Sequence, residues 1–202
     1  MLLAAANFCF LNRPINGYYM EFGCCSAWTF RKAYDVFSPI FPFWHFVGFD
    51  SFEGFPEIAE IDKQEIWQKG KDAMSEADFL QTVKDHGIPH EKFSTVKGFY
   101  SQSLTSSLQT KLLPTKAAVV YIDCDLYEST RDVFRFLPPF LQEGTVLIFD
   151  EWNAYLANDE RGERRAFREF QAQNPSLSFE PLWNNHMQSM FVYRGLKKTS
   201  GK

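Results

Sequence analysis

The 202-residue sequence lacks several features that would assign a protein to a class at once. Basic residues are not in excess, because 25 Asp and Glu outnumber 21 Lys and Arg and leave a net charge of -4. A nucleic-acid-binding protein usually carries a basic patch, so we expect no nucleic-acid partner. No hydrophobic run approaches the roughly 20 residues of a membrane-spanning helix, so we expect no membrane partner either.

Cysteine is also scarce, with four residues that have no metal-ligand spacing. Cys24 and Cys25 are adjacent, which disfavours a disulfide framework. The apolar start of the chain has no Lys or Arg before its apolar run, which disfavours a secretory signal. We therefore expect reduced thiols and a cytoplasmic location. The sequence leaves the oligomeric state open, and a homo-oligomer is compatible with it.

Aromatic residues are abundant, with 22 Phe, and apolar strand patterns alternate with helix patterns. The length fits one domain over residues 1–202, with a core at about 17–194. The patterns predict strands at 17–23, 44–50, 93–98, 117–123 and 144–150, helices at 26–37, 75–87, 104–113, 129–137 and 161–173, and a closing hairpin of 177–183 and 188–194.

Continuous apolar strands separated by helices predict an α/β fold with a mostly parallel sheet covered on both faces. The terminal hairpin adds an antiparallel strand to that sheet. Ligands of such sheets bind at the carboxyl ends of the strands. The polar stretch at residues 53–71 is too long for a tight connection, so we expect a loop that covers a site there.

Acidic residues gather at the predicted strand ends. Four of them follow two neighbouring strands and would repel each other unless a cation lies between them. Oxygen ligands favour a hard cation such as Mg²⁺. Simple helix capping by Asp123 or Asp150 is the alternative, and Asp50 either accepts hydrogen bonds from a ribose diol or is a solvated loop residue. The acidic residues are Glu21, Asp50, Asp123, Asp125, Asp150 and Glu151.

Several motifs resemble a known family. They are "DSFEGFPE", "VKGFYSQSL", and "DCDLYEST" followed about 25 residues later by "FDEW". Together they resemble the macrocin O-methyltransferase (TylF/MycF-type) family of class I S-adenosylmethionine-dependent enzymes, over about residues 17–194. The resemblance implies a Rossmann-like class I methyltransferase fold. Its mostly parallel seven-stranded sheet has a C-terminal antiparallel hairpin and helices on both faces.

The resemblance also implies roles for particular residues. Asp125 would be the general base that accepts the proton of an acceptor hydroxyl. Asp123, Asp150 and Glu151 would hold Mg²⁺ or Mn²⁺. The residues expected to bind S-adenosyl-L-methionine are Glu21, Gly23, Asp50, Ser51, Gly98 and Asp123.

The sequence departs from the family pattern at three places. Glu151 stands where a shorter Asp is usual, and the loop after the first strand has Ser26, Ala27 and Trp28 where small residues and more glycine are expected. The chain also begins only about 16 residues before the first strand, so the helical lid of relatives is expected to be nearly absent.

The expected function is an O-methyltransferase that acts on a hydroxyl of a small molecule, either a sugar or a phenolic natural product. Two other enzyme classes use aspartates spaced as Asp123 and Asp125 are. Haloacid-dehalogenase-type phosphatases place the pair on their first strand, and their threonine position is Tyr127 here. A glycosyltransferase D-x-D site leaves "DSFEGFP" and "FDEW" unexplained. A binding module that has lost catalysis is the non-enzyme alternative.

Overall fold

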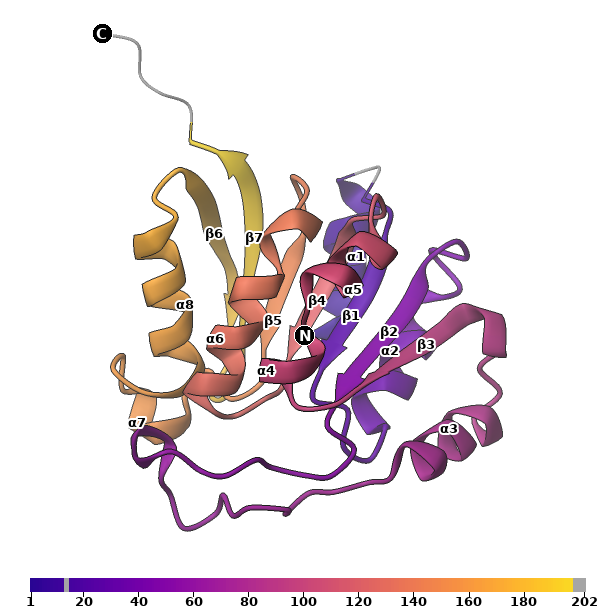
Figure 1. Ribbon diagram of the computed structural model, residues 1–202. Coiled ribbons are helices and arrows are strands. Elements are labelled where there is room, and N and C mark those ends of the chain that lie inside the picture. Colours follow the sequence, from indigo (N-terminus) through magenta and orange to yellow (C-terminus); the bar gives the residue numbers. More distant parts are fainter. Residues whose placement is uncertain (13–14, 198–202) are drawn as a thin grey trace, which may run out of the picture.

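A seven-stranded sheet forms the centre of the computed structural model, which describes residues 1–12 and 15–197. The strand order is β3-β2-β1-β4-β5-β7-β6 (Figure 1). The strands are β1 (Tyr18–Phe22), β2 (His45–Asp50), β3 (Phe93–Lys97), β4 (Ala117–Ile122), β5 (Val146–Phe149), β6 (Leu177–Asn184) and β7 (Ser189–Leu196).

The first five strands run parallel, whereas β7 pairs antiparallel with β5 and β6 pairs antiparallel with β7. Chain order reverses direction across the sheet at β1, which lies between β2 and β4. Glu21 of β1 is in register with Gly48 of β2 and Tyr121 of β4, so the loops after these strands begin side by side. The predicted mostly parallel sheet with an antiparallel C-terminal hairpin is confirmed.

Helices cover both faces of the sheet, as predicted. The predicted helix at 104–113 corresponds to α5, while α1, α4 and α7 were not predicted. The helices are α1 (Leu2–Leu11), α2 (Trp28–Phe37), α3 (Glu76–Asp85), α4 (Tyr100–Ser103), α5 (Ser106–Leu112), α6 (Tyr127–Phe136), α7 (Ala154–Ala157) and α8 (Gly162–Gln173), with short 3-10 turns at Glu60–Asp62, His90–Lys92 and Pro138–Phe140.

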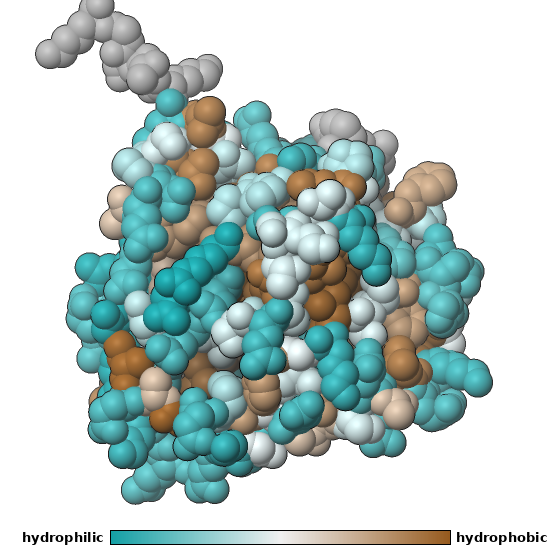
Figure 2. Space-filling view, viewed as in Figure 1, coloured by the Kyte–Doolittle hydropathy of each residue, from teal (hydrophilic) through white to brown (hydrophobic). Residues whose placement is uncertain are grey.

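Two hydrophobic cores result from the alternation of side chains along the buried strands. Tyr19 and Phe46 face the core that contains α1, α2 and α3. Their neighbours Met20 and Val47 face the opposite core, against α4, α5, α6 and α8. The outer surfaces of the helices on this second face are mostly hydrophilic (Figure 2). Both faces of the sheet are thus buried, and only the strand ends are left for a ligand.

The terminal helix α1 lies against α2 and buries Ala5, Ala6 and Cys9 in the first core. It therefore packs on the back of the sheet rather than over the strand ends. All four cysteines are free, and Cys25 is the exposed one. Among the described residues, no helix combines the length and the apolar character needed to cross a bilayer.

A long segment at residues 53–74 connects β2 to α3; we call it the crossing segment. It runs beneath the carboxyl ends of the strands toward α7 and returns to α3 (Figure 1). One 3-10 turn, Glu60–Asp62, interrupts it. Asp62 and Trp67 are nevertheless buried, with exposed fractions of 1% and 7%. The predicted loop over the strand ends is confirmed, and it is anchored to the body of the protein at these two side chains.

Candidate active site

A cavity of about 230 Å³ lies at the carboxyl ends of β1, β2, β3 and β4. Of the residues predicted to bind the cofactor, Gly23, Asp50, Ser51 and Asp123 line it, and Asp125 lines it as well. Phe99, Tyr100 and Ser101 contribute the wall that follows β3, while Arg131 and Asp132 of α6 and several residues of the crossing segment close the other side.

The loop after β1 approaches the end of β4 very closely. Gly23 has φ +93°, in the left-handed region that favours glycine. A Cβ atom built at this position would lie 1.7 Å from the backbone oxygen of Asp123. Gly23 is therefore required where the predicted cofactor loop meets the first aspartate of the D-x-D pair.

Asp50 holds this loop from the neighbouring strand. Its Oδ2 accepts hydrogen bonds from the backbone N–H of Cys24 at 2.7 Å and of Cys25 at 3.2 Å. Its Oδ1 accepts one from the backbone N–H of Phe52 at 2.7 Å. Asp50 is thus a structural acceptor for two loops, in addition to lining the cavity where a ribose is predicted.

Two other residues predicted to bind the cofactor, Ser51 and Gly98, make hydrogen bonds to backbone carbonyls, and a third, Glu21, is buried. Ser51 Oγ donates to the carbonyl of Gly54 at 2.8 Å, and the Gly98 N–H donates to the carbonyl of Asp50 at 2.9 Å. Glu21 is 0% exposed, and its Oε2 accepts from the Tyr19 hydroxyl at 2.5 Å. Glu21 and Gly98 are absent from the described cavity wall.

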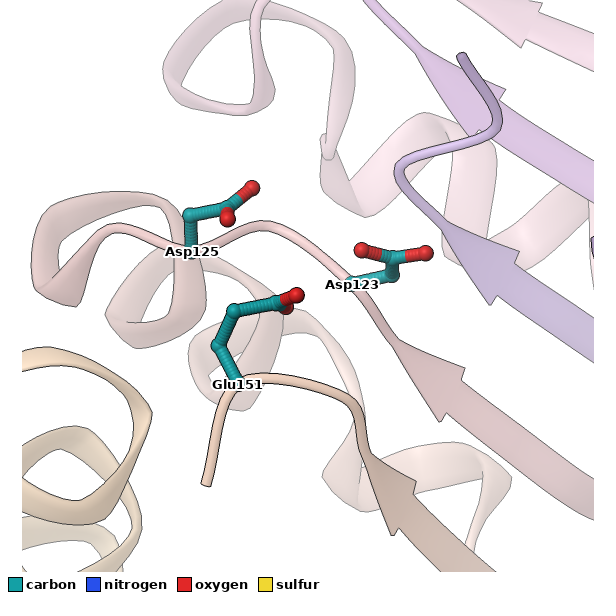
Figure 3. A group of neighbouring side chains, drawn as sticks. All are labelled: Asp123, Asp125 and Glu151. Carbon is teal, nitrogen blue, oxygen red and sulfur yellow. The ribbon is translucent and has the colours of Figure 1, made fainter. Parts of the chain in front are cut away.

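Three carboxylates converge beside the cavity. One oxygen each of Asp123, Asp125 and Glu151 lies within 4.8 Å of the other two. Figure 3 shows Asp123 and Asp125 on the turn after β4 and Glu151 reaching toward them from the turn after β5. We call these three side chains the acidic cluster.

The surroundings disfavour ionisation of the acidic cluster. Burial, reinforced by Asp150 and Asp125, raises the pKa of the Asp123 carboxyl well above its usual value. Burial and the neighbouring carboxylates also raise the pKa of Glu151 far above its usual range. Burial raises the pKa of Asp125 to about 7, although a hydrogen bond from Trp67 opposes the shift. A positive charge at this place would relieve the repulsion among all three groups.

Asp150 is placed differently from its predicted partners. Its Oδ1 accepts short hydrogen bonds from the Tyr121 hydroxyl and from the Gln188 side-chain amide. The structure therefore groups Asp125, rather than Asp150, with Asp123 and Glu151. Of the predicted metal ligands, Asp123 and Glu151 are brought together, and Asp150 turns toward Tyr121 of β4 and Gln188, the residue before β7.

Helix capping does not explain the aspartates after β4. Helix α6 begins at Tyr127, and its N-cap residue Leu126 has no capping side chain. The backbone N–H groups of Tyr127 and Glu128 instead donate to Asp62 of the crossing segment, at 2.7 and 3.3 Å. The cap comes from a residue 65 positions earlier in the chain. Asp125 does not cap this helix either, because its side chain accepts its hydrogen bond from Trp67.

Glu163 of α8 is a further acidic residue of the site, and the sequence interpretation missed it. It is 1% exposed, and its Oε2 accepts from the backbone N–H of Glu151 at 3.2 Å. Its Oε1 has no hydrogen-bond partner in the described part of the chain, and neither has Oε2 of Glu151. A signal was present in the sequence: Glu163 lies four residues before Phe167 and seven before Phe170, on the buried face of the helix.

Comparison with known proteins decides among the enzyme classes. The sequence matches the family described as macrocin-O-methyltransferase (TylF) over residues 44–184, which is more than half of the chain. The chain belongs to the TylF family. It is an O-methyltransferase that depends on S-adenosylmethionine, so the phosphatase, the glycosyltransferase and the non-catalytic module are wrong.

Solved structures give the same picture. The calicheamicin methyltransferase CalS11 superposes with a TM-score of 0.73 and 25% sequence identity, covering 95% of this chain and 76% of that one. The O-methyltransferase NovP has a TM-score of 0.73 and 19% identity, over 96% of this chain and 78% of its own. Podospora anserina PaMTH1, solved with S-adenosylhomocysteine, has a TM-score of 0.56 and 11% identity, over 95% and 76%. A comparison with curated protein sequences finds no match.

Proposed function

We propose that this TylF-family chain transfers the sulfonium methyl group of S-adenosylmethionine to a sugar hydroxyl of a small molecule, with Mg²⁺ or Mn²⁺ held at the acidic cluster. The observation that carries the proposal is the convergence of Asp123, Asp125 and Glu151 oxygens within 4.8 Å beside the cavity. The sugar acceptor is suggested by CalS11, one structure of which is described as a TDP-rhamnose 3'-O-methyltransferase.

The cavity has the chemistry that the cofactor requires. Gly23 brings backbone against the end of β4, and Asp50 presents carboxylate oxygens from β2. Phe99 and Tyr100 supply apolar wall after β3. The carboxylates around Asp123 favour a positively charged sulfonium. The cavity residues therefore fit S-adenosylmethionine.

The acidic cluster fits a hard divalent cation. All its donors are carboxylate oxygens, which suit Mg²⁺ or Mn²⁺ and give no reason for a preference for Zn²⁺. Oε2 of Glu151 is buried without a hydrogen-bond partner among the described residues, as an oxygen reserved for a ligand would be. We assign Asp123 and Glu151 as ligands. Asp150 remains the predicted third ligand through its Oδ2.

The residues of the chain divide the reaction between them. A bound divalent cation would lower the pKa of the acceptor hydroxyl and orient it. Asp125 accepts the hydroxyl proton, because its carboxylate lies beside the cluster and lines the cavity. Gly23 and Asp50 place the methyl donor, and the crossing segment covers one side of the cavity and excludes water. In-line transfer then releases S-adenosylhomocysteine.

The proposal is tested by methyl transfer to TDP-rhamnose and to a catechol, measured as S-adenosylhomocysteine release with Mg²⁺ or with a chelator. We expect activity with the sugar nucleotide that the chelator abolishes. Calorimetry should show S-adenosylhomocysteine binding in both conditions. The absence of binding at millimolar ligand would contradict the cofactor assignment, and full activity in the chelator would contradict the metal assignment.

The metal ligands are separated by two asparagine variants. We expect Asp123→Asn to weaken Mn²⁺ binding at least tenfold, because one oxygen ligand loses its charge. If Asp150 is the third ligand, Asp150→Asn gives a comparable loss while S-adenosylhomocysteine affinity changes little. Unchanged Mn²⁺ affinity in Asp150→Asn would instead assign the third position to Asp125.

A further inference from the structure

Trp67 connects the crossing segment to the proposed base. Its indole Nε1–H donates a hydrogen bond to Oδ1 of Asp125 at 3.0 Å, across 58 residues of sequence. The side chain is 7% exposed, so this contact is shielded from water. Asp125 Oδ2 accepts no hydrogen bond from any described residue, and Trp67 is therefore the side chain that fixes the orientation of this carboxylate.

The indole is held firmly in its place. Its ring lies 4.7 Å from the Tyr155 ring, centroid to centroid, and Leu126 belongs to the same buried cluster. The Tyr155 hydroxyl donates to Asp62 of the crossing segment at 3.1 and 3.3 Å. Tyr155 adopts a left-handed backbone conformation, with φ 55°, which a non-glycine residue keeps only when its surroundings hold it.

The crossing segment is held to the body of the protein at residues 61–63, shortly before Trp67 in the chain. Arg161 donates to the carbonyl oxygens of Ile61 and Lys63, both at 3.0 Å, and its guanidinium lies 4.7 Å from the centre of the Tyr155 ring. Asp62 between them caps α6 directly after the D-x-D turn. The Trp67 donor and the Asp125 acceptor are thus held by the same set of contacts.

The backbone of Asp125 alone does not determine where its carboxylate points. Asp125 has φ 58°, a left-handed conformation that costs on the order of 1 kcal/mol for a non-glycine residue. The hydrogen bond from the Trp67 N–H is what holds the carboxylate in the arrangement that the structure shows. An indole N–H only donates, so Trp67 cannot compete for the proton that Asp125 is proposed to accept.

We propose that Trp67 is a positioning residue for methyl transfer, which holds one oxygen of Asp125 and leaves the other to face the acceptor hydroxyl. The inference rests on the proposed role of Asp125 as the base. It adds a residue from the crossing segment to the machinery, although that segment supplies none of the three carboxylates of the acidic cluster. The alternative is that Trp67 only fills space between Leu126 and Tyr155.

The hydrogen bond is tested by nuclear magnetic resonance on protein labelled with ¹⁵N at its five tryptophan indoles. The Trp67 signal is identified by its loss in Trp67→Phe. We expect this signal to shift in Asp125→Ala, because its acceptor is removed, while the Trp183 signal stays in place. Trp183 lies half-exposed on β6 and serves as the control. A Trp67 signal that does not move would overturn the proposal.

The positioning role is tested by a cycle of variants in the methyl-transfer assay. We expect Trp67→Phe to lower kcat about tenfold, the effect of one lost charge-assisted hydrogen bond, with S-adenosylhomocysteine affinity unchanged. In the Asp125→Ala background the same substitution should have no further effect, and Trp183→Phe should be silent in both. An equal loss in both backgrounds, or full kcat in Trp67→Phe, would reduce Trp67 to a space-filling role.

The two proposals fail separately. A wild-type chain that transfers no methyl group to any acceptor contradicts the proposed function and with it the catalytic role of Trp67. The indole signal still decides whether Trp67 holds Asp125. If the enzyme is active but the Trp67 signal does not shift in Asp125→Ala, the proposed function stands and only this inference is wrong.

Discussion

The two halves of the strand-end surface are built in opposite ways. In the cofactor half, which comprises the loops at residues 23–27 and 50–54, Asp50 accepts three backbone N–H groups. In the acidic half, after β4 and β5, Glu151 and Glu163 each keep a buried oxygen without a partner in the described chain. The polar groups of the cofactor half are hydrogen-bonded in the folded chain alone, whereas the acidic half brings together carboxyl groups that repel each other when ionised.

This difference indicates that the acidic half lowers the stability of the fold and that function explains why it is kept. Buried carboxylates without a counter-charge destabilise a fold, and they persist where a ligand completes them. Backbone acceptors such as Asp50 need no ligand to be satisfied. We therefore expect substitutions in the cofactor half to damage folding and cofactor binding together. Those in the acidic half should damage chemistry while leaving the fold equal or more stable.

The largest effect is expected for Asp125→Asn in the acidic half. The amide keeps the shape and can still accept from Trp67, but it cannot take a proton, so methyl transfer should fall by about 10²–10⁴. Affinity for S-adenosylhomocysteine should change little. In the parent, activity should rise with pH as Asp125 ionises, with a midpoint at or below about 7, because a nearby cation lowers that pKa. An Asp125→Asn enzyme with the parent rate would show that Asp125 is not the base.

The substitution Gly23→Ala should distort the loop after β1 in the cofactor half. The added Cβ would meet the Asp123 carbonyl at 1.7 Å, so we expect a loss of about 3 kcal/mol in unfolding free energy and a clear loss of S-adenosylhomocysteine affinity. Urea unfolding and calorimetry measure the two. Gly87→Ala is the matched control, because Gly87 has a similar φ of +90° and no atom within 4 Å of the built Cβ. Equal losses in both variants would mean that backbone strain, and not the close approach, explains Gly23.

The substitution Glu21→Gln tests how much the buried carboxyl group beneath both halves lowers the free energy of unfolding. Burial raises the Glu21 pKa well above its usual value, so the folded chain keeps a proton that the unfolded chain releases near pH 4.5. The stability from this group is present below that pH and is lost as the pH rises toward the folded pKa. The variant should therefore gain stability relative to the parent as the pH rises from 5 to 8. The exposed Glu180→Gln should show no such trend. If Glu21→Gln is no more stable than the parent in this range, the assignment of a protonated Glu21 is wrong.

The smallest effect is expected for Glu151→Asp, which restores the shorter residue usual in the family. A carboxylate ligand remains, and a cation can shift to meet it, so methyl transfer and Mn²⁺ affinity should stay within about tenfold of the parent. Adding one carbon at Gly23 should thus matter far more than removing one at Glu151. A hundredfold loss in Glu151→Asp would show that the acidic half is as rigid as the cofactor half.

The strands and the C-terminal hairpin could be predicted from the sequence, because apolar runs and turn residues are local signals. The order of the strands in the sheet was not predicted, because it depends on pairing between segments far apart in the chain. The first helix, Leu2–Leu11, was missed because its apolar residues surround it and give almost no one-sided pattern. The turn at Tyr155–Ala157 was missed for another reason. Three consecutive non-glycine residues there have positive φ, which no local preference predicts.

Most of the candidate site residues were recognised by their place at strand ends, but their partners were not. The sequence brought Asp123, Asp125 and Glu151 to one edge, yet it could not show that Asp150 turns toward Tyr121 and Gln188. Contacts of this kind depend on side-chain rotamers and on residues far apart in the chain. The same holds for Asp62 and Trp67, which lie in a polar stretch without periodicity.

The remote cap of α6 has a consequence for the order of folding. Asp62 meets the N-terminus of α6 across 65 residues, and closing so long a loop has an entropic cost that is recovered only after the sheet between them exists. We therefore expect the crossing segment to dock late, after β4 and β5 have paired. Mutations at Asp62 should then speed unfolding while leaving the folding rate nearly unchanged. A nascent or partly unfolded chain would hold its cofactor loop in shape before it could methylate anything, so the enzyme acquires its activity in the last step of its own assembly.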